Sequence, residues 1–322
     1  MTMGAGEKFL QMLAVMAIFV AVLAVVLVLT SRVRSTVGRF LQTTAFLLPA
    51  GLLLLLGLLY PAVRTVVESF RDRASREWVG LANYERIFTD DALLVVLRNT
   101  AVWVILTPIL ATGIGLIYAV LIDRSRFERF AKALIFLPMA ISLVGASLIW
   151  KFVYAYRGTE QAQIGLANQI LKGLGFDTYR FISDPPWNTV FLIVILIWVQ
   201  AGFAMTVLSA AIKAIPDDIV EAARLDGVGG WRMFRHITVP SIQPSLIVVL
   251  TTITIATLKV FDIVRTTTGG NFETSVLAYE FYNQGFRAFD NGLGAALAVV
   301  LFALVVPVVV YNVRQMRKVE AR

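Results

Sequence analysis

Seven long apolar segments constrain the fold of this chain more than any other feature of its sequence. They cover residues 9–30, 44–63, 101–122, 131–153, 189–212, 244–263 and 294–313. A stretch of about 20 apolar residues is long enough to cross the hydrocarbon core of a bilayer as a helix. Hydrophobic residues make up 58% of the chain, a larger share than in soluble domains. The sequence therefore predicts an all-α, polytopic membrane helix bundle.

The first apolar segment, residues 9–30, is longer than the apolar core of a signal peptide. Lys8 and Glu7 precede it, and no small-residue cleavage site follows it. We expect residues 1–43 to form an extra N-terminal transmembrane helix with a basic inner loop. Residues 44–322 then form the main transmembrane domain.

Lysine and arginine are densest in four short segments, residues 31–43, 123–132, 213–243 and 314–322. Basic residues are enriched in the cytoplasmic loops of membrane proteins, so these segments are predicted to lie in the cytoplasm. Seven spans then place the N-terminus outside and the C-terminus in the cytoplasm. The same loops account for the net charge of +8, so the charge does not indicate nucleic-acid binding.

Composition excludes several kinds of site. The chain has no cysteine and one histidine, His236, which excludes thiolate and multi-histidine metal centres. No GxxxxGK[ST] phosphate loop occurs in the sequence. If ATP drives this protein, another chain must bind the nucleotide.

One polar stretch, residues 213–243, separates two very apolar segments. Pro216 stands where a helix would begin, followed by two aspartates that suit the helix dipole. The glycines of 227–230 end that helix. Residues 231–236 are predicted to form a second short helix that Pro240 ends. Loops of about 30 residues in a compact domain are uncommon and usually carry function.

A motif of fixed internal spacing lies in this stretch: Glu221, Ala222, Ala223, Gly227, Ile237 and Pro240. It resembles the EAA loop of ABC-importer permeases. In that loop a glycine follows the second alanine by four residues, an isoleucine lies ten further on, and a proline lies three beyond it. Val239 replaces the leucine that the family usually has, which is a conservative change.

The resemblance extends over residues 45–318. Residues 47–70, 79–84, 183–187 and 268–286 are similar to the corresponding parts of carbohydrate-uptake permeases, although Asn271-Phe272 replaces a frequent Gly-Pro. The resemblance implies a six-helix importer-type permease core in residues 44–322, preceded by the extra helix. It is closest to permeases for α-glucosides such as maltose and trehalose.

The resemblance also implies the chemistry and the partners. Such permeases are translocation subunits and not enzymes, and they bind no cofactor themselves. ATP and Mg²⁺ are held by separate ATP-binding cassette subunits, and a second permease subunit and an extracytoplasmic sugar-binding protein complete the assembly. The expected location is a bacterial-type plasma (inner) membrane.

Coupling to the ATPase is expected to depend on seven residues of the polar stretch: Glu221, Ala222, Ala223, Asp226, Gly227, Ile237 and Pro240. Glu221 is placed to accept hydrogen bonds from a partner surface, and the two alanines allow another surface to approach closely. Gly227 permits a backbone conformation that other residues resist. We expect Glu221→Lys or Gly227→Pro to uncouple transport without unfolding the spans.

Polar residues at membrane depth are costly and usually functional, and this chain has few. By resemblance to maltose permeases, counted from the EAA glutamate, the sugar-lining positions are Phe203, Ile253, Ala256, Thr257 and Val260, to which we add Gln200. The last four positions of the family set share one helical face. The threonines of residues 251–257 could instead bond back to helix carbonyls, and Lys259 could pair with Asp262.

An ion-coupled secondary sugar transporter is the alternative interpretation. It predicts clusters of charged residues inside the membrane and inverted repeats. Lys259 and Asp262 are the charged residues that fit this description, and no repeat is visible in the sequence.

Overall fold

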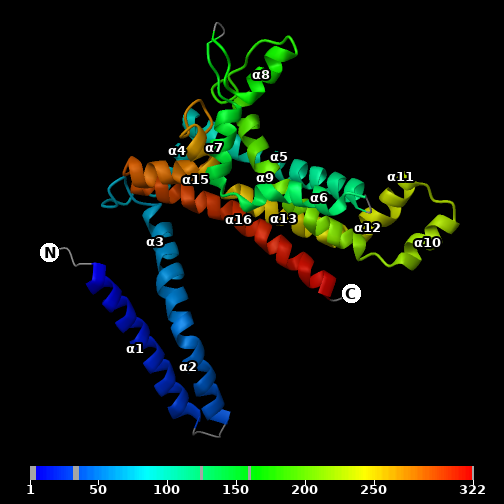
Figure 1. Cartoon of the computed structure of the whole chain (residues 1–322). Coiled ribbons are helices and arrows are strands. Elements are labelled where there is room, and N and C mark those ends of the chain that lie inside the picture. The colour runs from blue at the N-terminus through cyan, green and yellow to red at the C-terminus, as the bar shows by residue number, and fades with distance from the viewer. Residues whose placement is uncertain (1–4, 32–35, 124–125, 159–160, 321–322) are drawn as a thin grey trace. The chain divides into compact units, whose positions relative to one another are not determined.

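The computed structural model describes residues 5–31, 36–123, 126–158 and 161–320. The chain is helical over most of this length, and the described residues contain no β-strand, which confirms the predicted all-α class. The chain divides into two compact units, Met1–Val67 and Glu68–Arg322, shown in Figure 1.

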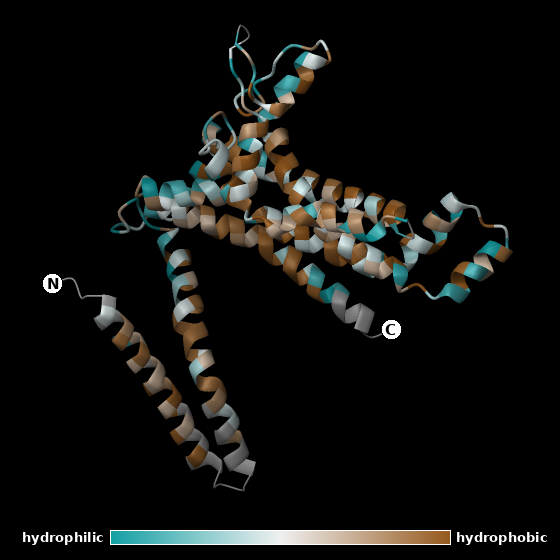
Figure 2. Cartoon of the chain, viewed as in Figure 1, coloured by the Kyte–Doolittle hydropathy of each residue, from teal (hydrophilic) through white to brown (hydrophobic). Residues whose placement is uncertain are grey.

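The first unit consists of helices whose described side chains are largely exposed. Its elements are α1 (Ala5–Ser31), α2 (Thr36–Leu54), the π-helical turn η1 (Leu55–Leu59) and α3 (Tyr60–Glu68). Helices α1 and α2 contact each other and are mainly hydrophobic, as Figure 2 shows. Residues 36–43 were expected in an inner loop but are helical. The expected loop residues Arg32 and Arg34 lie outside the described part of the chain.

The second unit contains the remaining elements, which follow one another in chain order. They are α4 (Ala82–Thr89), α5 (Asp91–Ile122), α6 (Glu128–Phe136), the 3₁₀ turn η2 (Leu137–Ala140), α7 (Leu143–Val153), α8 (Leu166–Gly173), α9 (Trp187–Lys213), α10 (Asp217–Leu225), α11 (Gly230–Met233), the π-helical turn η3 (Phe234–Thr238), α12 (Val239–Ser241), α13 (Gln243–Leu258), α14 (Asp262–Thr267), α15 (Leu277–Tyr282), the π-helical turn η4 (Asn283–Arg287) and α16 (Asn291–Glu320).

Six of the predicted spans have counterparts among the described helices. Four helices are long and apolar enough to cross a membrane: Phe46–Glu68, Asp91–Ile122, Trp187–Lys213 and Asn291–Gln315. Two bent pairs each count as one further span if taken together: Glu128–Ala140 with Leu143–Val153, and Gly230–Ser241 with Gln243–Leu258. The first predicted segment, residues 9–30, lies within α1, where Phe9–Val22 is apolar.

Each bent pair changes direction at a short non-α-helical connection. The helix Glu128–Ala140, which ends in η2, makes an angle of 103° with α7, and the break between them lies at Ile141 and Ser142. Pro138 lies within η2, where the α-helix tightens to a 3₁₀ turn, and the sharp bend comes only after that turn. The second bend, of 70°, lies at Ile242. Helical structure continues through Pro240 to Ser241, so the prediction that Pro240 ends the second short helix is wrong.

The core of the second unit is built on the contact between α5 and α9, against which α13 also packs. Trp103, Leu192, Met205 and Ile253 are fully buried there. Gly115 of α5 lies so close to α9 that a Cβ atom on it would be 2.4 Å from the Cβ atom of Ala204. A residue without a side chain therefore sets the distance between these two helices.

The two ends of the second unit serve as reference points. We call the end where α5 and α9 finish, near Asp123 and Lys213, the loop end, because residues 213–243 follow there. We call the end where α5, α9 and α16 begin, near Asp91, Trp187 and Asn291, the opposite end.

Helix α13 is shorter than the predicted span 244–263. It ends at Leu258, and α14 begins only at Asp262. Lys259 and Asp262 therefore do not share a helical face, and they form no ion pair with each other among the described contacts. The suggestion that they pair on one helix is wrong for this structure.

Candidate coupling site and translocation pathway

Helix α10 is a short helix with well-defined ends. Pro216 precedes it, and Asp217 and Asp218 occupy its first turn, where negative charge suits the helix dipole. At its other end Gly227 has a φ of +73°, which residues with a Cβ atom rarely adopt. The backbone N–H of Val228 donates to the carbonyl of Ala223 and that of Gly227 to the carbonyl of Arg224, both at 3.0 Å. This is a Schellman motif, and it satisfies carbonyls at the helix end.

The motif residues are divided between two faces of this loop. Ala223 is buried at 7% exposure, whereas Glu221, Ala222, Asp226, Gly227 and Pro240 are exposed and Ile237 is half-buried. Two large apolar side chains, Leu225 at 89% and Trp231 at 70%, are also exposed on it. The sequence motif did not identify Leu225 and Trp231, which extend the exposed surface beyond the motif.

A cluster of four charged side chains lies at the loop end, directly before α10. Lys132 Nζ is 2.8 Å from Glu128 Oε1 and 3.4 Å from Asp123 Oδ1, and Lys213 Nζ is 3.3 Å from Asp123 Oδ1. Lys213 also pairs with Glu128. We call these residues the ion cluster. It joins α5, α6 and α9 at Lys213, the last residue of α9, where the polar stretch begins.

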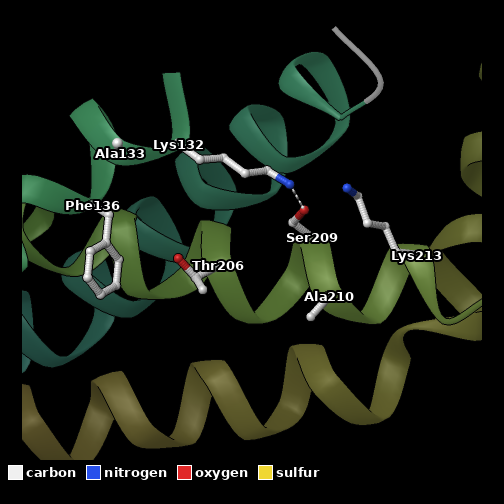
Figure 3. Close-up of a pocket in the computed structure, with 7 residues that line it drawn as sticks. All are labelled: Lys132, Ala133, Phe136, Thr206, Ser209, Ala210 and Lys213. Atoms are coloured by element: carbon white, nitrogen blue, oxygen red, sulfur yellow. Dashed lines mark hydrogen bonds between the residues drawn. The ribbon is translucent and has the colours of Figure 1, made fainter. Parts of the chain in front are cut away.

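The ion cluster borders a pocket of ≈ 450 Å³ between α6 and α9, shown in Figure 3. Lys132, Ala133 and Phe136 line it from α6, and Thr206, Ser209, Ala210 and Lys213 line it from α9. Lys132 donates a hydrogen bond to Ser209, drawn as the dashed line in Figure 3. Apart from this polar end, apolar atoms form most of the pocket wall.

A second pocket, of ≈ 520 Å³, separates α10 and α11 from the ends of α5 and α9. Its walls include Asp123, Lys213, Val220, Arg224 and Met233. A partly open space therefore separates part of the polar stretch from the helix bundle, and the stretch is not packed against the bundle along its whole length.

Five of the six predicted pathway residues lie on α9 and α13, whereas Val260 follows the end of α13 at Leu258, so the predicted helical face does not extend to it. Gln200 and Phe203 are half-buried on α9, and Ala256 is half-buried on α13. Ile253, Thr257 and Val260 are 0%, 1% and 4% exposed. Helices α9 and α13 contact each other, so the structure brings the two groups of residues to neighbouring elements.

Three threonine hydroxyls of α13 donate to carbonyls of their own helix. Thr251, Thr254 and Thr257 each donate to the carbonyl four residues earlier, at 2.7 Å. The sequence left open whether these hydroxyls face the pathway or bond back to helix carbonyls, and in this conformation they bond back to the helix.

Long-range polar contacts at the opposite end were not identified from the sequence. Asn99 Nδ2 donates to the carbonyls of Glu273 at 2.6 Å and Ser275 at 3.0 Å, and Asn188 Nδ2 donates to that of Phe272 at 2.6 Å. The two asparagines are 2% and 0% exposed. They fix the segment between α14 and α15 to α5 and α9.

Two relatives resemble most of the chain. It is 47% identical over 275 residues to the osmoprotective compounds uptake permease protein GgtC of Synechocystis sp., covering 85% of this chain and 99% of that protein. It is 48% identical over 279 residues to the α-glucoside transport system permease protein AglF of Rhizobium meliloti, covering 86% of this chain and 83% of that protein.

The fold is also found in a solved structure of a bacterial alginate ABC transporter in complex with an alginate pentasaccharide-bound periplasmic protein. The TM-score is 0.74 at 22% identity, covering 87% of this chain and 96% of that chain. A family model described as the binding-protein-dependent transport system inner membrane component matches residues 93–319. The chain therefore belongs to the family of inner membrane components of binding-protein-dependent transport systems.

Proposed function

We propose that this chain is a permease subunit of an ATP-driven, binding-protein-dependent importer for an α-glucoside di- or oligosaccharide. ATP is hydrolysed on a separate ATP-binding cassette subunit, which holds the nucleotide and Mg²⁺. A second permease subunit and an extracytoplasmic sugar-binding protein complete the assembly. The family membership and the 48% identity to AglF support this proposal, whereas nothing in the comparisons supports the ion-coupled alternative.

The observation that carries the coupling role is the exposed face of α10. Glu221 offers a carboxylate, Ala222 leaves room for a neighbouring surface, and Leu225 presents an apolar side chain that is 89% exposed. Glu221 and Leu225 are four residues apart, so they lie on the same face of α10 and one partner surface can contact both. The ATPase subunit is the partner that covers this face.

Movement of α10 would be transmitted to the membrane-spanning helices, because the chain connects both ends of α10 to them. On one side Lys213, three residues before Pro216, is tied by the ion cluster to α5 and α6. On the other side, the helical structure from Gly230 to Ser241 leads through the 70° bend into α13. A displacement of α10 by the ATPase would therefore act on α9 and α13, the two helices that carry the predicted pathway.

The proposed orientation places the loop end in the cytoplasm, with the N-terminus outside and the C-terminus inside. The density of basic residues in residues 123–132 and 213–243 supports it. Sugar then enters from the opposite end and passes the pathway residues of α9 and α13. Because Ile253, Thr257 and Val260 are buried, α13 must shift before these positions can meet a sugar.

A second candidate substrate class is an osmoprotective compound, which the 47% identity to GgtC favours. Uptake of labelled maltose and, separately, of labelled glycine betaine by vesicles that contain the whole importer separates the two classes. We expect uptake of maltose and no uptake of glycine betaine. Uptake of glycine betaine without uptake of maltose would replace the α-glucoside by an osmoprotectant.

Co-purification from native membrane tests the coupling site. We expect wild-type protein to recover the ATPase, the second permease and the binding protein, and Glu221→Lys to lose the ATPase alone. Glu85→Lys is the matched control, because it reverses an exposed helical glutamate on α4, near the opposite end. If Glu221→Lys retained the ATPase as well as Glu85→Lys does, the docking role of α10 would be wrong.

A further inference from the structure

The segment between α14 and α15 is held in one conformation by side chains from elsewhere in the second unit. The amides of Asn99 and Asn188 donate to its backbone carbonyls. Within the segment, the hydroxyls of Thr268 and Thr274 bond at 2.6 Å, and Tyr279 Oη donates to the carbonyl of Gly269 at 2.7 Å. A segment fixed in this way can present side chains at constant positions.

A polar pocket of ≈ 410 Å³ lies between this segment and the α15–η4 helix. We call it the outer pocket. Six residues contribute its polar and aromatic lining: Gly269, Asn271, Tyr279, Glu280, Asn283 and Arg287. A volume of this size is within the range of small-molecule sites.

The lining carries no net charge, because it contains one carboxylate and one guanidinium. Glu280 is a fixed acceptor, since Ser275 donates to it at 2.8 Å and Gln284 at 2.7 Å. Arg287 donates to Tyr279 Oη at 3.3 Å, which leaves most of its five N–H groups without a partner among the described residues. Such a mixture of donors and acceptors suits a neutral polyhydroxylated ligand better than an anion or a cation.

An aromatic wall joins the outer pocket to the predicted pathway. The ring of Tyr279 lies 6.0 Å from that of Phe261, and Phe261 lies 5.1 Å from Tyr282. Phe261 directly follows Val260, the last of the predicted pathway positions. Tyr279 of the outer pocket therefore neighbours the residue that follows the last predicted pathway position.

We propose that the outer pocket is a binding subsite for a neutral sugar, a proposal that rests on the importer function proposed above. The sugar occupies it on the way from the opposite end of the bundle to the α13 positions. Amide oxygens of Asn271 and Asn283 accept hydrogen bonds from its hydroxyls, and the guanidinium of Arg287 donates to them.

Protection of single cysteines tests this subsite, because the chain has no cysteine of its own. Ala288→Cys and Asn283→Cys place a thiol in the outer pocket, and Gln161→Cys places one on an exposed residue outside it. Each variant is assembled with its partner subunits in proteoliposomes and labelled with a membrane-impermeant maleimide. The probes are maltose and digalacturonate at millimolar concentration, each with and without the sugar-free binding protein.

We expect maltose to slow labelling of both pocket cysteines several-fold, digalacturonate to have little effect, and Gln161→Cys to be unaffected. Adding Asn283→Ala to Ala288→Cys should raise the maltose concentration for half protection by roughly two- to tenfold, the effect of one lost neutral hydrogen bond. Unchanged labelling with maltose at both pocket cysteines would overturn the subsite. Equal protection by the sugar-free binding protein alone would instead make the pocket a protein contact.

Maltose uptake by wild-type vesicles in the same preparation separates the two hypotheses. If wild type imports maltose but neither pocket cysteine is protected, the subsite is wrong and the importer function stands. If wild type imports no neutral sugar, the importer function itself fails, and the subsite fails with it.

Discussion

The two ends of the second unit are held together by different chemistry. At the opposite end, buried amides of Asn99 and Asn188 donate to backbone carbonyls of the segment between α14 and α15. At the loop end, the ion cluster joins α5, α6 and α9 through side chains such as Lys213, which is 49% exposed. The opposite end combines these buried uncharged hydrogen bonds with the ion pairs Arg86–Asp290 and Arg98–Glu273, whereas the described contacts between α5, α6 and α9 at the loop end include the ion cluster.

This difference sets how easily each end can change. Leaving a buried polar group without its partner costs about 1–3 kcal/mol, whereas an ion pair of an exposed side chain contributes about 0.2–1 kcal/mol. Asp123, Glu128 and Lys132 are 7%, 22% and 24% exposed, so Lys213 is the member of the ion cluster that can leave it at a small cost in free energy. Such an arrangement suits a subunit in which a partner moves the polar stretch at the loop end.

The largest expected effect is at the opposite end. Asn99→Leu removes the donor to two carbonyls, of which that of Ser275 is buried, so we expect a loss of about 1–3 kcal/mol in the free energy of unfolding. The measurement is the fraction of detergent-solubilised protein that remains monodisperse after heating. Asn291→Leu is the control, because that side chain is exposed. Equal effects of the two changes would remove the contrast between the ends.

A smaller effect is expected at the end of α10. Gly227→Ala forces a residue with a Cβ atom into a left-handed conformation, at about 1–2 kcal/mol. Its added methyl group meets no other atom within 4 Å, so the strain is confined to the backbone. Gly229→Ala is the matched control, because Gly229 is equally open but has a φ of −70°. We expect Gly227→Ala alone to lower transport-coupled ATP hydrolysis, with heat stability of the bundle unchanged for both.

A salt-dependent effect is expected within the ion cluster. Lys213→Gln leaves two carboxylates with one lysine, and we expect a loss of about 0.2–1 kcal/mol at low salt that fades as salt is raised. Lys172→Gln on α8 is the control, because Lys172 forms no ion pair among the described residues. The Asn99→Leu loss should not depend on salt. If the Lys213→Gln effect persisted in high salt, the loop end, like the opposite end, would be stabilised by interactions that salt does not screen.

The smallest effect is local to the connection before α4. The backbone N–H groups of Glu77 and Arg76 donate to Asp72 Oδ1, and these bonds lower the pKa of the Asp72 carboxyl. Because the pKa is lower in the folded state, its stabilisation is present above the unfolded pKa of about 3.9 and is lost as pH falls further. Hydrogen exchange of residues 72–77 should therefore speed up in acid beyond its intrinsic pH dependence. In Asp72→Asn, that additional change should be absent.

Local patterns in the sequence predicted the features that depend on a few neighbouring residues. The left-handed Gly227 follows from its place directly after the predicted helix. It is fixed by the backbone within one turn. The same holds for the start of α10 after Pro216.

Features that depend on distant residues could not be predicted in this way. The ion cluster joins Asp123 to Lys213, and Asn99 meets a carbonyl 176 residues away at Ser275. Nothing in the residues around either partner indicates the other. The early end of α13 at Leu258 was also missed, because apart from Lys259 the sequence stays apolar through Val260 and Phe261, while the backbone has already left the helix.

The π-helical turns η3 and η4 lie in the two parts of the molecule to which we assign contacts with other molecules. A π turn accommodates one more residue than an α turn. Conversion of such a turn to α-helix shifts the register of everything beyond it by one residue, a rotation of about 100° around the helix axis. Because a residue is either inside the turn or outside it, such a change has discrete end states and no gradual intermediates. At η3 the helix that would rotate leads into α13.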